Sequence, residues 1–257
     1  MKFKIDEQNY INYEDNGEGP AIIFLNGFGA NSKIWMAQVD FFTKKGYRVI
    51  TFDYLNHGES SRVKYDLSID DLIDETLELI NYLKVSQPIL IGNSMGAAVL
   101  FGIINKKGWS FIKTVIAIDQ SPKMMNDENW NYGFKDLNVN NFKLVMAEKI
   151  SHPAYHRIDN GVYQQSKKID EQYGFSQTKN APLLLNHARK DWRFIFKDLN
   201  KPFLFILGEK SPFFDAAKSK VLTKLNKNIK VKVMNGVGHI PMAEMPEVFN
   251  QIVIEFI

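Results

Sequence analysis

Segment 92–96, which reads Gly-Asn-Ser-Met-Gly, contains residue types that could carry out nucleophilic catalysis. A serine hydroxyl is a poor nucleophile in water, but on a sharp strand-to-helix turn it projects from a sheet and can meet a base. The apolar run 88–91 predicts the strand, and the small residues from Ala97 onward predict the start of a helix. Both glycines fit a crowded turn in which a Cβ would clash. An ordinary strand-to-helix turn would show the same pattern, so Ser94 needs partners elsewhere in the chain.

A serine nucleophile needs a base, and histidine is the usual one. In hydrolase sheets the order along the chain is Ser, acid, His. Of the five histidines, only His239 lies in a glycine-flanked loop directly after a late predicted strand. His57 precedes the serine, and we interpret it as structural. His152, His156 and His187 fall in the middle of the chain, where we expect surface or packing roles.

Alternating strands and helices must position these residues. Short apolar or β-favouring runs predict strands at 2–5, 10–14, 21–25, 47–53, 88–91, 114–118, 202–208 and 229–234. Helical patterns follow at 32–45, after the N-cap Ser68, after Ser94 and at 246–256. This alternation predicts an α/β fold with a doubly wound, mostly parallel sheet of about eight strands.

The rhythm changes between residues 123 and 200, where no strong buried strand is predicted. We expect this segment to be an inserted helical lid, with residues 1–122 and 201–257 forming the core. The segment is rich in aromatic side chains. Four of them could line an acyl pocket or could simply pack the lid onto the core: Trp130, Tyr132, Phe134 and Trp192.

The composition of the 257 residues excludes several classes of function. There are no cysteines, so disulfides, thiolate metal sites and a cysteine nucleophile are ruled out. The net charge of +3 is small and both signs are interspersed, which gives no support to a nucleic-acid partner. The polar start does not resemble a signal peptide, and no apolar run approaches the roughly 18 residues of a membrane span. We expect a cytoplasmic protein without metal or cofactor, and the sequence gives no indication of its oligomeric state.

Several motifs, in the right order over nearly the whole chain, resemble those of the α/β-hydrolase superfamily, in its serine esterase and haloperoxidase-like branch. Segment 26–29 (Asn-Gly-Phe-Gly) resembles the family's His-Gly oxyanion loop, with Asn26 in place of His. Segment 53–60 resembles the Asp-x-x-Gly-His-Gly-x-Ser loop, with Asn56 in place of Gly. Segment 92–96 matches the nucleophile elbow.

The resemblance implies a role for each matching residue. Ser94 would be the nucleophile, and His239, preceded by Gly238, would be the base. The backbone N–H groups of Phe28 and Met95 would form the oxyanion hole.

The acid of the triad is where the sequence departs from the family pattern. The family usually places an Asp shortly after the strand that follows the lid, and Ser211 occupies that position here. Three carboxylates remain as candidates, namely Asp119, Glu209 and Asp215. We favour Asp119 because it ends a predicted strand, where active-site groups gather.

The sequence therefore supports two hypotheses. The first is a serine hydrolase that cleaves a carboxylic ester of a small to medium apolar substrate through an acyl-enzyme. The same triad could act on a thioester or a lactone, or could carry out perhydrolysis. The second is a ligand-binding protein of hydrolase fold with little catalysis, which the serine at position 211 keeps open.

Overall fold

A computed structural model describes residues 1–148 and 152–257. Its centre is an eight-stranded sheet with the order β1-β2-β4-β3-β5-β6-β7-β8. The strands are β1 (Lys2–Lys4), β2 (Tyr10–Asn16), β3 (Ala21–Leu25), β4 (Arg48–Phe52), β5 (Ile89–Asn93), β6 (Thr114–Ile118), β7 (Phe203–Gly208) and β8 (Ile229–Met234). The six strands from β3 to β8 pair in parallel, and β2 pairs antiparallel with both β1 and β4. The predicted fold class is confirmed.

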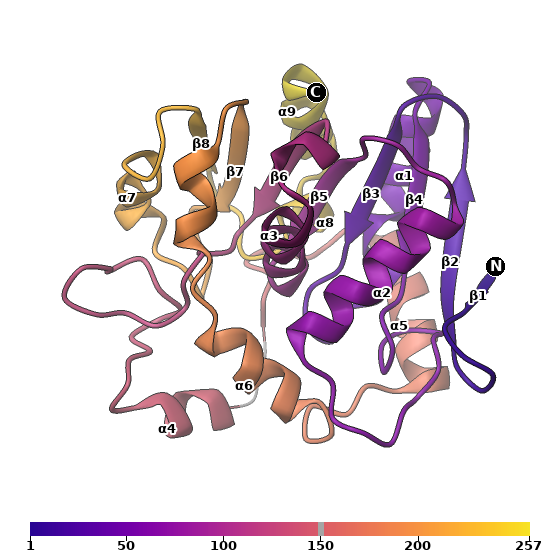
Figure 1. Cartoon of the computed structure of the whole chain (residues 1–257), viewed down its shortest axis with the longest axis horizontal. Coiled ribbons are helices and arrows are strands. Elements are labelled where there is room, and N and C mark those ends of the chain that lie inside the picture. The colour runs from indigo at the N-terminus through magenta and orange to yellow at the C-terminus, as the bar shows by residue number, and fades with distance from the viewer. Residues whose placement is uncertain (149–151) are drawn as a thin grey trace.

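Helices cover both faces of the sheet (Figure 1). One face carries α2 (Ile69–Tyr82) and α3 (Met95–Lys107). The other carries α1 (Met36–Lys44), α8 (Pro241–Glu244) and α9 (Pro246–Phe256), and the short α7 (Lys220–Thr223) precedes β8. The helix predicted at 32–45 begins as a 3₁₀ turn over Ser32–Trp35 and becomes α-helical at Met36.

Burial on both faces explains the continuous apolar runs of the strands. In β5, Ile89 and Ile91 join the core beneath α1 and α9, whereas Leu90 joins the core beneath α2 and α3. Successive side chains of a strand point to opposite faces, so a strand covered on both faces has no position left for a polar residue. The sheet thereby brings the carboxyl ends of its parallel strands to one edge.

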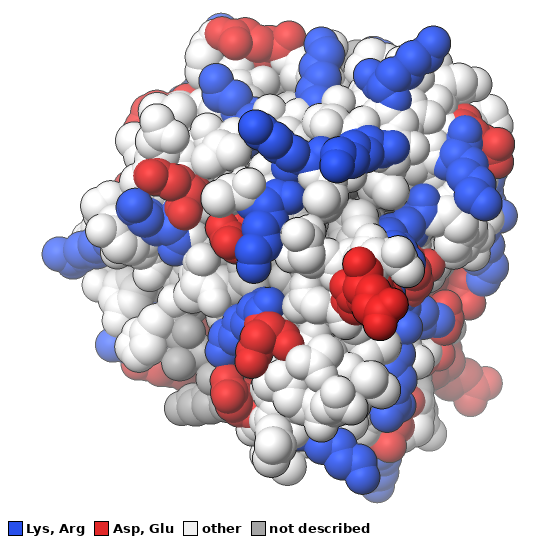
Figure 2. Space-filling view, turned by 90° about the vertical axis from the view of Figure 1, so that its left-hand side faces the viewer, with Lys and Arg blue, Asp and Glu red and all other residues white. Residues whose placement is uncertain are grey.

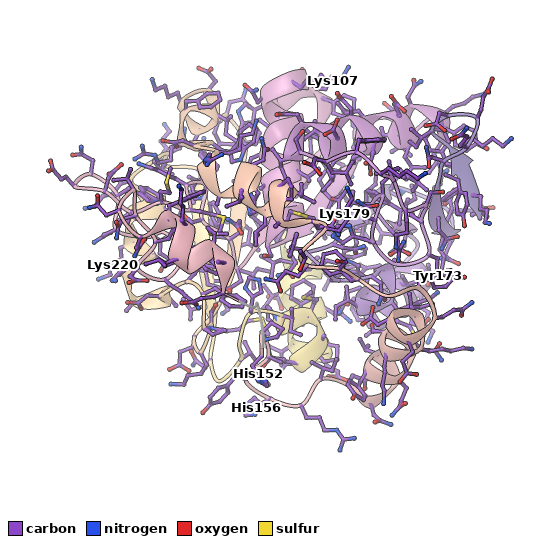
Figure 3. All side chains as sticks on the ribbon, turned by 90° about the horizontal axis from the view of Figure 1, so that it is seen from below. Lys107, His152, His156, Tyr173, Lys179 and Lys220 are labelled. Carbon is purple, nitrogen blue, oxygen red and sulfur yellow. The ribbon has the colours of Figure 1, made fainter. Side chains whose placement is uncertain are left out.

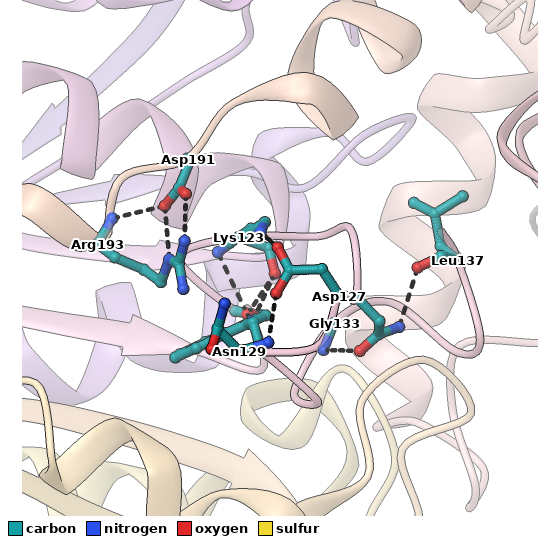
Figure 4. A network of polar contacts seen from close by, with 10 residues as sticks. Lys123, Asp127, Asn129, Gly133, Leu137, Asp191 and Arg193 are labelled. Carbon is teal, nitrogen blue, oxygen red and sulfur yellow. Dashed lines mark hydrogen bonds and ion pairs between the residues drawn. The ribbon is translucent and has the colours of Figure 1, made fainter. Parts of the chain in front are cut away.

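The insertion between β6 and β7 contains α4 (Phe142–Ala147), α5 (Asn160–Tyr173), α6 (Ala181–Arg189) and a 3₁₀ segment (Arg193–Asp198). Its described residues form no strand beyond two isolated bridges. One of these joins Lys123 at the start of the insertion to Asp191 near its end, and the N–H of Trp192 donates to the carbonyl of Pro122 at 2.8 Å. Figure 4 shows the polar network here, in which Lys123 pairs with Asp127 and Arg193 pairs with Asp191. The boundaries 123–200 of the lid remain a prediction.

The surface carries both signs of charge. On the face shown in Figure 2, Lys and Arg side chains are interspersed with Asp and Glu. Within residues 1–148 and 152–257, no helix has both the length and the apolar character that a membrane crossing requires.

Candidate active site

Ser94 lies on a strained turn between β5 and α3. Its φ of 55° and ψ of −123° fall in a region that residues with a side chain rarely adopt. The two flanking glycines make the turn possible. A Cβ on Gly92 would lie 2.5 Å from the backbone of Gly96, and a Cβ on Gly96 would lie 2.2 Å from the carbonyl oxygen of Leu25. The steric reason expected from the sequence is thus present in the structure.

The imidazole of His239 contacts the carboxylate of Asp119. Nδ1 of His239 lies 2.6 Å from Oδ2 of Asp119, and both side chains are buried. A carboxylate only accepts hydrogen bonds, so this contact places the proton on Nδ1 and leaves Nε2 as the basic nitrogen. His239 follows β8 in the loop that leads to α8. The two residues are 120 positions apart, and the fold brings them together at the carboxyl edge of the sheet.

Asp119 is held by hydrogen bonds from the end of β7 and the loop that follows it. Its Oδ1 accepts from the N–H of Gly208 at 3.0 Å, and its Oδ2 accepts from the hydroxyl of Ser211 at 2.5 Å. Ser211, which stands where the family usually has the acid, therefore donates to the carboxylate that contacts His239. Asp119 adopts a φ of 43°, so its backbone leaves β6 in a sharp turn.

The two other carboxylate candidates lie elsewhere. Glu209 accepts from the N–H of Gly236 at 2.8 Å and pairs with Lys210, and the Gly236 bond lowers the pKa of this exposed side chain. Asp215 caps a 3₁₀ turn by accepting from the N–H of Ala217 at 3.0 Å. Of the three candidates, the structure brings Asp119 to the imidazole.

Two polar side chains position the loop of His239. The amide of Asn93 donates to the carbonyl of His239 at 2.9 Å. The buried carboxylate of Glu244 accepts from the N–H of Gly238 at 3.0 Å and from the N–H of Tyr155 in the insertion at 2.8 Å. These bonds tie the histidine loop to β5 on one side and to the insertion on the other. The sequence did not predict these roles, since only the fold reveals both partners of each bond.

The loop after β3 lies beside the serine. A Cβ on Gly27 would lie 3.3 Å from the Cβ of Ser94. In the part of the chain that is described, the N–H groups of Phe28 and Met95 have no hydrogen-bond acceptor, so both are free to bind an oxyanion. Asn26 is buried and bridges two elements, because its amide donates to the carbonyl of Phe52 and its oxygen accepts from the indole of Trp35, both at 2.7 Å. Its role is to fix this loop.

The loop after β4 is tied to the segment after β3 by hydrogen bonds. Asp53 accepts from the N–H of Ser32 at 2.6 Å and from the N–H of Glu59 at 3.0 Å, and burial raises its pKa. Asn56 has a φ of 64°, in the left-handed region that glycine adopts more readily than residues with a side chain. His57 is fully buried with Nδ1 3.0 Å from the carbonyl of Leu55, and burial lowers its pKa to about 4. Its position fits the structural role expected for it.

The histidines of the insertion differ from one another. His152 and His156 are exposed at the periphery of the molecule (Figure 3). His187, in α6, is 3% exposed and lines the cavity next to Ser94. The expectation of a surface or packing role for His187 therefore misses its contact with the cavity.

Ser94 and His239 line one cavity of about 320 Å³. Most of the remaining lining is apolar. It comes from the loop after β3 and the 3₁₀ turn that follows it, the start of α3, the insertion, the segment after β7 and the histidine loop. Its larger apolar members are Phe28, Ile34, Met95, Met124, Phe134, Phe175, Leu184, Phe213 and Ile240. Among the described residues, no group of three His, Cys, Asp or Glu side chains is arranged to hold a metal ion.

Of the four aromatic residues expected in the pocket, Phe134 lines this cavity. Trp130, Tyr132 and Trp192 lie outside its lining, so these three match the packing alternative and not the pocket alternative. Each is buried in packing of its own. The indole of Trp130 donates to the carbonyl of Lys123 at 3.0 Å, the ring of Tyr132 packs against Phe214, and Trp192 faces Gly102 of α3.

Comparison with known proteins decides the family. A family model described as the alpha/beta hydrolase fold matches residues 20–246. The chain belongs to this family. The family resemblance and the enzyme class predicted from the sequence, both those of an α/β hydrolase, are thereby confirmed.

Relatives of this α/β hydrolase are similar over most of their length. A protein of Mycoplasma genitalium named "Putative esterase/lipase 2" is 28% identical over 91% of this chain and 88% of its own. A non-heme haloperoxidase of Rhodococcus erythropolis is 23% identical over 89% of both chains. Among solved structures, an esterase from Exiguobacterium antarcticum has a TM-score of 0.82 at 18% identity, covering 96% of this chain and 95% of its own. At these identities the structural likeness shows the shared fold.

Proposed function

We propose that this α/β hydrolase is a serine hydrolase that cleaves a carboxylic ester of a small to medium, apolar substrate through an acyl-enzyme intermediate. The observation that carries the proposal is the contact between His239 and Asp119 at the cavity that also contains Ser94. Relatives named as an esterase/lipase and as an enol-lactonase support ester chemistry.

In the acylation step, Ser94 Oγ attacks the ester carbonyl carbon while its proton moves to Nε2 of His239. The carbon–oxygen double bond opens to an oxyanion, which the N–H groups of Phe28 and Met95 stabilise. Asp119 accepts from Nδ1 and stabilises the imidazolium that forms. The tetrahedral intermediate then collapses, the ester bond to the alcohol breaks, and the alcohol oxygen takes the proton from Nε2.

In the second half, His239 removes a proton from water, and the resulting hydroxyl attacks the acyl-enzyme. A second oxyanion forms and collapses, which releases the carboxylic acid and returns the proton to Ser94 Oγ. No cofactor is required for either half of this sequence.

The cavity supports the proposed size and polarity of the substrate. Its volume of about 320 Å³ is near the lower end of small-molecule sites, and its lining is mainly aromatic and aliphatic. Hydrolysis of thioesters, hydrolysis of lactones and formation of peracids use the same catalytic groups. Because relatives are named as a haloperoxidase and an enol-lactonase, these reactions should be tested as well. The alternative hypothesis of a ligand-binding protein is based on the serine at position 211. The contact between Asp119 and His239 weakens it, because Asp119 supplies the carboxylate that Ser211 does not. A cytoplasmic location remains a prediction from the sequence.

The test is the turnover of p-nitrophenyl esters from acetate to octanoate by the wild-type protein and by Ser94→Ala. We expect the variant to lose at least about 10⁴-fold in kcat while its melting temperature stays close to that of the wild type. Undiminished turnover by a clean preparation of the variant would overturn the proposal. A thioester and a lactone of matched acyl length, assayed in the same panel, rank the substrate classes.

A further inference from the structure

The catalytic cavity has two ends that differ in exposure. One end is buried and includes Met124, Phe134, Leu184, His187 and Phe213. Contacts among these residues keep them together: the rings of Phe134 and Phe213 stack at 5.2 Å, and Phe213 packs edge-on at 4.6 Å against His239. The other end is half-buried or exposed and includes Pro153, Ser166, Asp170 and Phe175.

His187 is the polar side chain among these five residues, and the buried amide of Gln120 also lines the cavity. His187 is 3% exposed, and its Nδ1 has no hydrogen-bond partner among the described residues. Burial lowers its pKa to about 4, so the imidazole is neutral near pH 7 and can donate from one nitrogen and accept at the other. Leu184 lies one helical turn before it on α6 and lines the same end. A buried polar group without a partner is costly, and buried polar groups are normally paired.

The order of product release relates the two ends to the two halves of the ester. In the proposed mechanism the alcohol departs first, while the acyl group stays attached to Ser94 until water releases it. The alcohol half leaves first, so it fits the end of the cavity that opens to solvent. The half that stays bound fits the buried end.

We propose, resting on the proposed function, that the buried end binds the acyl group of the ester and that His187 hydrogen-bonds a neutral oxygen on that group, a hydroxyl or a ketone. The preferred substrates are therefore hydroxyacyl or ketoacyl esters rather than plain alkanoyl esters. His187 is the specificity residue for this class.

Charged acyl groups fit this end poorly. A carboxylate would lose its hydration among Met124, Phe134 and Leu184, and such a transfer is costly without a charged partner. The described residues that line the cavity include Asp170 and no Lys or Arg. A neutral oxygen needs only the single hydrogen bond that His187 offers.

The test compares p-nitrophenyl esters in matched pairs that differ in one oxygen. The pairs are 3-hydroxybutyrate against 3-methylbutyrate, 4-oxopentanoate against 4-methylpentanoate, and 5-oxohexanoate against 5-methylhexanoate. For at least one pair, we expect the wild type to favour the oxygenated ester by 10-fold or more in kcat/KM. Sites built to hydrogen-bond a substrate group discriminate strongly against analogues that lack it.

Two substitutions then isolate the role of His187. His187→Leu should remove or reverse the preference, because the loss of kcat/KM should be larger for the oxygenated ester of each pair than for its alkanoyl partner. His187→Gln, which can still donate and accept, should retain part of the preference. The matched control His156→Leu replaces an exposed histidine of the insertion and should behave as the wild type. Labelling of Ser94 by a fluorophosphonate probe confirms that each variant is folded.

The outcomes separate the two proposals. A wild type that favours the oxygenated ester by less than 10-fold in every pair, or a preference that is unchanged in His187→Leu, overturns this inference and leaves the esterase proposal standing. A wild type that hydrolyses none of the esters overturns the proposed function, and the inference fails with it.

Discussion

Glu75 on α2 should make the stability of this protein fall as the pH rises. Its side chain is fully buried, with Oε2 accepting from the N–H of Leu55 at 3.1 Å and Oε1 without a partner among the described residues. Burial raises its pKa from 4.5 to about 8. Between these two values the folded state holds a proton that the unfolded state has released. The stability linked to this group is therefore complete below pH 4.5 and declines toward pH 8.

The magnitude follows from the two pKa values. At pH 7, keeping Glu75 protonated costs the folded state about 3.4 kcal/mol, and at pH 5 the cost is about 0.8 kcal/mol. Glu75→Gln replaces the protonated carboxyl by an isosteric neutral group. It should raise the free energy of unfolding at pH 7 by up to this amount, less the cost of the unpaired amide N–H, and should change it little at pH 5.

Urea unfolding at both pH values measures the effect. Glu18→Gln is the control, because Glu18 is exposed in the turn before β3 and is not among the charges that act on Glu75. We expect the control to show no such dependence on pH. If Glu75→Gln stabilises the protein equally at pH 5 and pH 7, or no more than the control does, the assignment of a buried protonated carboxyl is wrong.

Further predictions concern the groups around the active site. Asp119→Asn should lower kcat by about 10³- to 10⁴-fold, measured with p-nitrophenyl butyrate, whereas Glu209→Gln should leave kcat within about 3-fold of the wild type. Ser211→Ala removes a hydrogen bond to a carboxylate worth about 1.5–3 kcal/mol and should lower kcat by about 10- to 100-fold without a matching rise in KM; an unchanged kcat would show that this hydroxyl does not support the acid. Glu244→Gln replaces a carboxylate that accepts three backbone N–H bonds and should lower the free energy of unfolding by about 1–3 kcal/mol, visible as a lower melting temperature. The pKa of His57 is lowered to about 4, so the stability linked to this group is complete above pH 6.5, and the free energy of unfolding falls by up to about 3.4 kcal/mol as the pH drops to 4. His57→Phe removes this dependence and should flatten the acid side of a plot of the free energy of unfolding against pH.

The sequence predicted the parts of the fold that depend on local pattern. The bounds of β3, β6, β8 and α9 agree with the apolar runs and the proline that define them. The N-cap at Ser68 is also present, with Asp71 completing a capping box. These features depend on neighbours within a few residues, and the sequence contains all of that information.

The sequence could not reveal contacts between distant segments. The place of Asp119 at a strand end is enough to favour it as the acid. That the hydroxyl of Ser211 donates to it can be seen only from the register of β6 against β7. The aromatic residues of the insertion show the same limit. Composition indicates that Trp130 and Phe134 are buried, yet only the path of the chain decides that Phe134 faces the cavity and Trp130 does not.

The central claim is that the contact of His239 with Asp119 activates Ser94, and labelling by a fluorophosphonate probe tests it most directly. Mass spectrometry should find the probe on Ser94 of the wild type. The rate of labelling should fall by about 10³-fold or more in His239→Ala and in Asp119→Asn, because the probe reacts only with an activated serine. Absence of the label from Ser94, or an unchanged labelling rate in Asp119→Asn, would contradict the account.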